Sequence, residues 1–171
     1  MKPNGVNRVL TSPLAAELMR SRLVMHLAYS GADGYPRVIP IGYLFDGRSF
    51  IVCTADKAPK VDALIADERV ALTIDTETQP PRILLVRGTA SVEMVEGVPR
   101  EYLEASRRYI APENWNSFET QVRALYKRMA RIRINPDWAK LIDFETTLPI
   151  AVEQLVAQRS GSMVESRRRK V

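Results

Sequence analysis

The stretch from Leu23 to Thr76 decides the fold, and it reads LVMHLAYSGADGYPRVIPIGYLFDGRSFIVCTADKAPKVDALIADERVALTIDT. Several runs in it are rich in β-branched and aromatic residues, which favours strands. Tight turns at Asp33-Gly34 and Asp46-Gly47 separate the first three runs. Asp-Gly between such runs is a strong hairpin signal. The stretch therefore predicts antiparallel strands at residues 23–29, 37–45, 49–54 and 69–75.

The third of these strands leads into a helix start that carries two lysines. Lys57 and Lys60 flank Pro59, and a helix N-terminus favours anions because its N–H groups are free and its dipole is positive there. Lysines are disfavoured at this end, so a bound anion would explain them; otherwise they are ordinary solvated lysines. Thr54 ends the strand with a hydroxyl suited to a phosphate oxygen, or it is simply a β-favouring residue. We predict that Thr54, Lys57 and Lys60 bind a phosphate.

The first part of the chain predicts one short helix and no strand. Residues Met1–Thr11 show no periodicity and are expected to be irregular. Ser12 and Pro13 are suited to the cap and first position of a helix over Pro13–Arg20. A second helix is expected at Pro59–Asp67, and its inward-facing residues are expected to be Val61, Leu64 and Ile65.

The second half of the chain predicts a long strand followed by helices and shorter strands. Arg82–Val95 reads as a strand with a bulge or corner at Gly88. Many short strands joined by turns favour a closed or partly open barrel. The further elements that we expect are helices at Gly97–Tyr109, Asn114–Met129 and Ala151–Ala157, and strands at Arg131–Asn135 and Leu141–Phe144, which Pro136–Trp138 separates.

Composition fits one globular domain: of 171 residues, 46% are hydrophobic and 26% are charged. We assign this domain to residues 1–158, with a helical insertion at 97–129. Residues 159–171 form a basic tail that accounts for most of the net charge of +5. We expect this tail to be solvated and disordered. Nucleic-acid binding is not expected, because no aromatic interleaving or known motif accompanies the basic residues.

The numbers of cysteines and histidines and the lengths of the apolar runs indicate the cellular setting and argue against metal and membrane binding. The single Cys53 cannot form an internal disulfide, which favours a reduced, cytoplasmic setting. The single His26 excludes most histidine-based metal sites, so no metal is expected. No apolar run is long enough to cross a bilayer, and no signal peptide is visible. Membrane association is therefore not expected.

Three segments, PRVIPIGYLFDG (36–47), FIVCTADKAPKVDAL (50–64) and PPRILLVRGTASVE (80–93), carry a family resemblance. They resemble the FMN-binding split-barrel group, which holds the pyridoxamine 5'-phosphate oxidase-like proteins and the deazaflavin (coenzyme F-420) oxidoreductases. The resemblance extends over Leu23–Phe144. It implies an α+β fold: a six-stranded, mainly antiparallel split β-barrel with peripheral helices.

The resemblance also implies cofactor-binding residues. Lys60 occupies the position of a basic residue that contacts the cofactor phosphate, while Pro59 stands where the family often has a second basic residue. Arg37 fills a basic position at the start of the second strand, and Val38, Ile39, Pro40 and Ile41 would present an apolar wall and backbone groups to the ring. The alternative is a plain core strand with Arg37 at its rim. Independently of the resemblance, Arg82 and Arg87 are five residues apart and lie on opposite faces of a regular strand. One of them, which we take to be Arg87, is expected to reach the cofactor of the same or the neighbouring subunit, and the other to pair with Glu93 or Asp75.

The function implied is hydride transfer from bound FMN, or alternatively coenzyme F-420, to a small unsaturated substrate. The resembling proteins pair as homodimers with the cofactor at the interface. No catalytic side chain is assigned, because the ring carries the chemistry. The alternatives are a non-enzymatic FMN- or haem-binding protein and a barrel with an empty mouth. The C-terminal segment WAKLIDFETTLP has no histidine, which argues against pyridoxamine phosphate as substrate.

Overall fold

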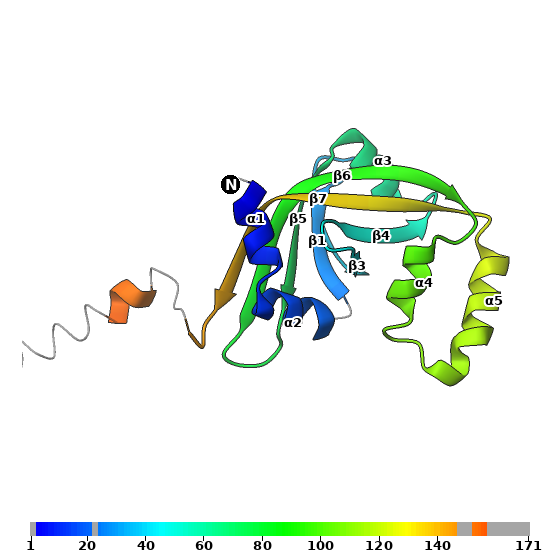
Figure 1. The fold of residues 1–171 in the computed structure, drawn as a ribbon. Coiled ribbons are helices and arrows are strands. Elements are labelled where there is room, and N and C mark those ends of the chain that lie inside the picture. Colours follow the sequence, from blue (N-terminus) through cyan, green and yellow to red (C-terminus); the bar gives the residue numbers. More distant parts are fainter. Residues whose placement is uncertain (1–2, 22–23, 147–151, 157–171) are drawn as a thin grey trace, which may run out of the picture.

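The computed structural model describes residues 3–21, 24–146 and 152–156 (Figure 1). Within these residues, seven strands form one sheet in the order β2-β1-β5-β6-β7-β4-β3, and every neighbouring pair is antiparallel. The strands are β1 Val24–Ser30, β2 Pro36–Gly42, β3 Leu44–Phe45, β4 Phe50–Ala55, β5 Arg69–Asp75, β6 Arg82–Glu96 and β7 Arg128–Asp143. The edge strands β2 and β3 follow one another in the chain, separated by Tyr43 alone.

Helices lie around the curved sheet, as Figure 1 shows. They are α1 Pro3–Leu10, α2 Pro13–Ser21, α3 Pro59–Ala66, α4 Arg100–Ser106, the 3₁₀ turn η1 Pro112–Asn114 and α5 Trp115–Leu125. No helix within the described ranges has the length and apolar character needed to cross a membrane. The α+β, antiparallel split-barrel prediction is confirmed, with a seventh strand because Tyr43 separates β2 from the two-residue β3.

Both predicted Asp-Gly turns are present. Gly34 has φ 80° and Gly47 has φ 92°, backbone values that favour glycine. The Asp33 carboxylate accepts the backbone N–H of Tyr35. The Asp46 carboxylate accepts the N–H groups of both Arg48 and Ser49. The aspartates thus hold the turns with hydrogen bonds to nearby backbone, which fixes the β1–β2 and β3–β4 hairpins.

The core lies inside the curve of the sheet and draws alternate residues from the long strands and β4. Each fully buried aliphatic or aromatic side chain contributes about 1.5–3 kcal/mol. The predicted face of β5 is confirmed, and Leu64 from α3 joins the same cluster. The cluster includes Met25, Leu27, Phe50, Val52, Val70, Leu72, Ile74, Leu84, Val86, Ala90, Ile132, Ile134 and Ala139.

Two sequence predictions for the helices were wrong. Met1–Thr11 was expected to be irregular, but Pro3–Leu10 is helical. Val6 and Leu10, four residues apart, are both buried in the core, so tertiary packing outweighs a weak local pattern. Ile65 was expected to face inward, but its side chain is 64% exposed. The predicted cap of α2 is confirmed, because the Ser12 hydroxyl accepts the N–H of Ala15.

The prediction that Pro136–Trp138 separates two strands was also wrong, because β7 runs unbroken through them. The register with β6 shifts between Arg87 and Gly88: Gly88 pairs with Pro136, whereas Arg87 pairs with Trp138. One extra residue of β7 is accommodated there, which confirms the predicted bulge. A Cβ at Gly88 would come within 2.2 Å of the Asn135 carbonyl oxygen, so only glycine fits the bulge.

Between β6 and β7 the chain forms a helical hairpin with its own small core of Leu103, Trp115 and Val122. Both helices are shorter than predicted, and Met129 belongs to β7. Residues 152–156 are helical. The ends of the expected helix Ala151–Ala157 and the basic tail 159–171 lie outside the described residues.

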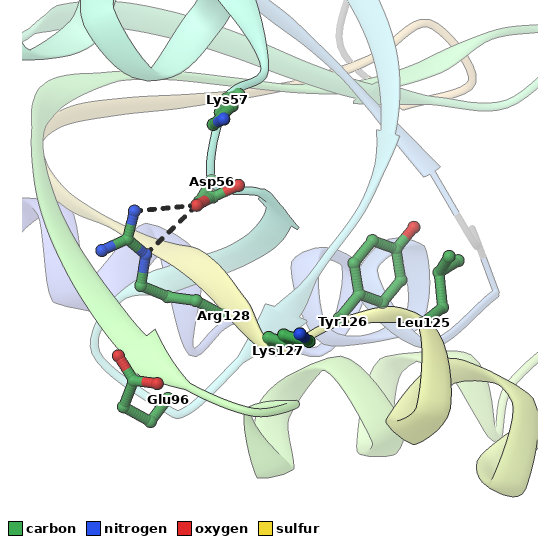
Figure 2. A pocket seen from close by; sticks show the side chains of 7 residues that line it. All are labelled: Asp56, Lys57, Glu96, Leu125, Tyr126, Lys127 and Arg128. Carbon is green, nitrogen blue, oxygen red and sulfur yellow. Dashed lines mark hydrogen bonds and ion pairs between the residues drawn. The ribbon is translucent and has the colours of Figure 1, made fainter.

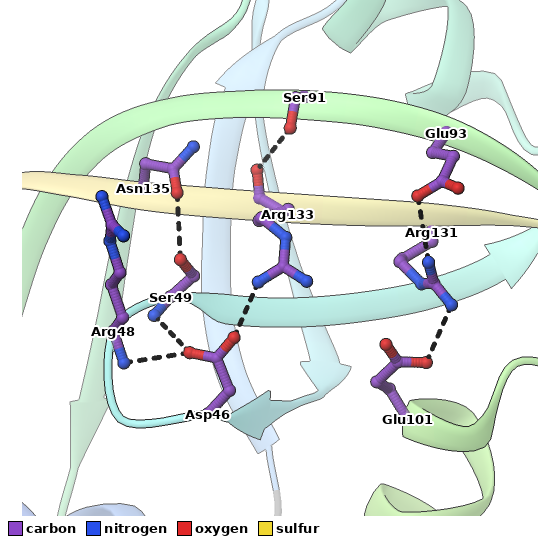
Figure 3. A network of polar contacts seen from close by, with 9 residues as sticks. All are labelled: Asp46, Arg48, Ser49, Ser91, Glu93, Glu101, Arg131, Arg133 and Asn135. Carbon is purple, nitrogen blue, oxygen red and sulfur yellow. Dashed lines mark hydrogen bonds and ion pairs between the residues drawn. The ribbon is translucent and has the colours of Figure 1, made fainter.

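A polar network ties this hairpin to the sheet (Figure 3). Arg131 on β7 forms ion pairs with Glu93 of β6 at 3.0 Å and with Glu101 of α4 at 3.2 Å. Arg133 pairs with Asp46 at 2.7 Å. The network therefore joins α4 and the β3–β4 turn to the centre of the sheet.

Candidate functional site

The end of β4 and the start of α3 bring two of the predicted phosphate ligands together. The Lys60 amine donates to the Thr54 hydroxyl at 3.3 Å. Lys60 is half-buried, and burial lowers the pKa of its amine. Ala58, the cap residue of α3, offers no side-chain acceptor to the first turn. This end of α3 therefore combines a lysine amine, a hydroxyl and a helix N-terminus without side-chain capping, a donor set suited to a phosphate.

Lys57 lies beside a different feature, an open pocket of about 580 Å³. Figure 2 shows Lys57 at one side of this pocket and Lys127 at another. Arg128 donates to Asp56 through Nε at 3.1 Å and Nη2 at 2.9 Å. The residues that line the pocket are Asp56, Lys57, Glu96, Leu125, Tyr126, Lys127 and Arg128. Lys57 is thus one of its lining residues, whereas Thr54 and Lys60 are not.

Strand β2 is at an edge of the sheet, as expected for a strand that contains Pro40. Ile39 and Ile41 pack against the core, which places Val38 and Pro40 on the outer face. Val38 is 64% exposed. Pairing of β2 with β1 leaves the other side of β2 open for backbone contacts.

Arg37 is held by the β1–β2 turn in this structure. Its Nη2 atom lies 2.6 Å from Oδ2 of Asp33, and both side chains are about half exposed. The N–H of Tyr35, together with Arg37, holds the pKa of the Asp33 carboxyl below its usual value. In this structure Arg37 therefore forms an ion pair with Asp33, and it is not part of the contact between Lys60 and Thr54.

A small pocket of about 110 Å³ connects the ends of β2 and β4. It is lined by Ile41, Gly42, Ile51, Cys53, Glu101, Tyr102, Ala105 and Tyr109. Burial raises the pKa of the Cys53 thiol to about 12, so the thiol is protonated at neutral pH. The pocket joins two segments that the sequence assigned to cofactor binding, and α4 covers it.

Sequence reasoning missed the contribution of α4 to this pocket. Tyr102 lies in α4 and Tyr109 follows its end, and their separation of seven residues would place them on one face of the helix predicted over Gly97–Tyr109. That spacing was a usable signal for two tyrosines facing the sheet. Their position over β2 and β4 was not readable, because it depends on how the β6–β7 hairpin folds back.

Arg87 lies on the outer face of the sheet, stacked over Trp138 at 4.4 Å from the ring centroid. The register aligns it in one cross-strand row with Val38, Ala28 and Ala71. Paired residues of neighbouring strands present side chains on the same face. Arg87 and Val38, both predicted site residues, therefore share the outer face, whereas Lys60 and Thr54 lie at the end of β4.

Arg82 has other partners than predicted. Its guanidinium pairs with Glu145 at 2.5 Å, with Glu17 at 3.5 Å and with Asp143 at 3.7 Å. Glu93, one predicted partner, instead binds Arg131. Arg82 therefore links α2 to the end of β7. Separately, the described residues hold no group of three or more His, Cys, Asp or Glu side chains placed to bind a metal ion.

Residues 12–142 match the sequence family described as pyridoxamine 5'-phosphate oxidase. The chain belongs to this family. The matched region contains all of the predicted site residues, from Arg37 to Arg87. Members of the family typically bind a flavin. A search of curated proteins finds no relative of the chain.

Several solved structures share this fold at low sequence identity. A conserved hypothetical protein of Mycobacterium tuberculosis is 22% identical with a TM-score of 0.58, covering 78% of this chain and 86% of its own. An F420 reductase is 23% identical with a TM-score of 0.54, covering 81% and 98%. HutZ, the haem storage protein of Vibrio cholerae, is 19% identical with a TM-score of 0.55, covering 77% and 92%. At these identities the likeness establishes the fold alone.

Proposed function

We propose that the protein is a flavin- or deazaflavin-dependent oxidoreductase of the pyridoxamine 5'-phosphate oxidase-like group. It would bind FMN or coenzyme F-420 and transfer a hydride to a small unsaturated molecule. The observation that supports this most is the contact of Lys60 with Thr54 at the start of α3. A half-buried ammonium beside a hydroxyl and a helix N-terminus fits the phosphate that both cofactors carry.

The proposed ring site extends from this phosphate site along the gap between β2 and β4. Ile41 and Cys53 line the pocket that connects the two strands. Ile39 and Ile41, whose side chains face the core, would offer apolar contacts, and residues Val38 to Ile41 would offer backbone groups. When bound, the ring supplies the hydride chemistry. The protonated Cys53 thiol leaves this pocket without a thiolate that could attack the ring. In this proposal the side chains bind, orient and exclude water, and none is assigned as an acid or base.

The other predicted ligands have supporting roles. Lys57 lies three residues before Lys60 and would add long-range attraction for the phosphate. Arg37 would have to exchange Asp33 for the cofactor, which costs little because the ion pair is exposed. Arg87 would act from the outer face, on the cofactor of a second subunit.

Comparison of FMN with riboflavin tests the phosphate site. Replacing both lysines, Lys57→Ala with Lys60→Ala, should weaken binding of FMN and of F-420 by about one to two orders of magnitude, since the charge-assisted hydrogen bond from Lys60 is worth about 1.5–3 kcal/mol and Lys57 adds only long-range attraction. Riboflavin, which lacks the phosphate, should bind the parent and the double variant alike. Calorimetric titration measures both.

The matched control is Arg100→Ala with Arg123→Ala, which removes two exposed positive charges from the helical hairpin. It should leave FMN affinity unchanged. If the lysine variant binds FMN and F-420 as tightly as the parent does, the phosphate site lies elsewhere and the assignment of Lys60 is wrong.

A second candidate, haem binding without catalysis, is favoured by the position of His26. Its imidazole is on the outer face opposite Pro40, and Nδ1 lies 3.8 Å from the Asp75 carboxylate. This is an ion-pair distance and not a hydrogen bond, but a carboxylate in this position could accept the ring N–H and orient the histidine for a metal. Absorption spectra after titration with haemin and FMN separate the candidates: a sharp haem band that is lost in His26→Ala would favour haem, whereas flavin bands would favour the oxidoreductase.

A further inference from the structure

A third pocket, intermediate in volume between the two described above, lies at the other end of β4 from Thr54. It has a volume of about 410 Å³, within the range of small-molecule sites. It is lined by Leu10, Thr11, Ala16, Met19, Arg20, Tyr43, Leu44, Phe45, Gly47 and Arg108. These residues come from the α1–α2 junction, α2, the β2–β3 link, β3, the β3–β4 turn and the segment after α4. The pocket shares no lining residue with the proposed cofactor site.

The wall formed by the strands is aromatic and rigid. Tyr43 is 1% exposed, and its hydroxyl donates to the Met19 carbonyl at 3.1 Å. The Phe45 and Phe50 rings lie 4.8 Å apart, and the Tyr43 and Phe50 rings 5.8 Å apart. An apolar ligand would therefore meet a surface that is already packed, at little cost in side-chain ordering.

Arg108 holds the charged side of the pocket in place. It donates to the carbonyls of Tyr43 at 3.3 Å, Met19 at 2.8 Å and Arg20 at 3.2 Å. These bonds join α2, the β2–β3 link and the end of α4 at one point. The three bonds hold the positive charge of Arg108 at a fixed place beside the pocket, where it favours an anionic group.

The charges of the lining side chains select the ligand class. Arg20 and Arg108 are cationic, and the lining residues include no acidic side chain. We propose that this pocket binds a small amphipathic acid, with its apolar body against Tyr43 and Phe45 and its carboxylate beside the two arginines. Neither FMN nor F-420 is needed for this binding, so the proposal does not depend on the proposed oxidoreductase activity.

Titration with decanoate, measured by calorimetry, tests the proposal. The parent should bind decanoate at one site and should bind decan-1-ol, which has the same chain without the charge, more weakly. Arg20→Ala should weaken decanoate binding about tenfold, the loss of about 1.4 kcal/mol, and should leave decan-1-ol binding unchanged. Arg100→Ala, which removes an exposed arginine of α4, is the matched control and should bind both as the parent does.

Filling the pocket gives the complementary test. Ala16→Phe adds a ring from the half-buried face of α2 and should abolish decanoate binding while FMN titrates as in the parent. If Ala16→Phe does not fold, Leu44→Trp, which fills the pocket from β3, replaces it as the test and should likewise abolish decanoate binding. The proposal is overturned if the parent binds no decanoate, if a folded filled variant still binds it, or if Arg20→Ala weakens the acid and the alcohol equally.

Discussion

The half-buried amine of Lys60 predicts how cofactor binding depends on pH. Burial lowers the pKa of this amine in the free protein, whereas a bound phosphate favours the charged form and raises it. FMN affinity should therefore be greatest at neutral pH and fall as the pH rises through the pKa of the free amine, because binding must then take up a proton. Dissociation constants measured from neutral to alkaline pH follow this fall.

The variant Lys60→Arg separates this effect from general alkaline changes. Arginine stays protonated throughout that range, so the variant should keep its FMN affinity to higher pH than the parent. Riboflavin should show no such difference. Identical FMN profiles for parent and variant would mean that another group controls the pH dependence.

At the bulge, Gly88→Ala should destabilise the protein by about 1–3 kcal/mol, the usual cost of forcing extra volume into packed structure. The new Cβ would meet the Asn135 carbonyl, which is backbone and cannot rotate away. Urea unfolding measures the loss. Ser91→Ala, in the same strand and exposed, should change stability by less than about 0.5 kcal/mol; equal effects would mean that the bulge tolerates a side chain.

Among the predicted site residues, the structure brings together those whose contact is local. Thr54 and Lys60 are six residues apart, and a strand end followed by a helix start was enough to bring them together. Arg37 had a nearer carboxylate, Asp33, in the turn that precedes it. Tyr102 and Tyr109 reach the β2–β4 gap through a fold-back of the chain that no local pattern encodes.

At the scale of elements, the docking of α4 depends on Glu101 more than on Glu93. Both carboxylates bind Arg131, but the Glu101 side chain is 19% exposed and the Glu93 side chain 65%. Glu101→Ala should cost about 1–3 kcal/mol, because Arg131 then keeps a largely buried charge without its better-shielded partner. Glu93→Ala should cost less than about 0.5 kcal/mol. Thermal unfolding of both variants makes the comparison, and the reverse order would contradict the assigned role of Glu101.

The strands and turns were largely readable from sequence because their signals are local: Asp-Gly turns and β-rich runs mark β1, β2, β4 and β5. Two elements were not. Helix α1 forms around Val6 and Leu10, which gain their stability from burial in the core. Strand β7 contains Pro136, and a proline in a sequence indicates a strand break. In the structure Pro136 pairs with Gly88 at the bulge, where the hydrogen-bond ladder is already interrupted.

At the scale of the whole molecule, the outer face that carries Val38 and Arg87 is the surface that we expect to pair in a homodimer. Light scattering coupled to size exclusion should show a dimer for the parent. Val38→Glu should shift it to monomer, since a charge would be buried at the interface. If the cofactor lies at that interface, FMN affinity should fall about tenfold or more, corresponding to at least about 1.4 kcal/mol.

The control for this prediction is Ile65→Glu, because Ile65 and Val38 are both 64% exposed and apolar. This variant should stay dimeric and bind FMN as the parent does. A dimer that both variants leave intact would mean that the dimer interface lies elsewhere. A monomeric parent would mean that there is no such interface.

The pairing of β4 with β7 has a consequence for how the chain is made. The pairs run from Ala55 with Met129 to Phe50 with Ile134, so β4 leaves the ribosome long before its neighbour exists. In the meantime the sheet can form among β1, β2, β5 and β6, but the edge of β4 that pairs with β7 stays without its partner strand. Long-range pairing of this kind slows folding, and an unpaired edge invites association with other chains. Aggregation should therefore compete with folding most strongly during synthesis, in the interval after β4 has emerged from the ribosome and before β7 has.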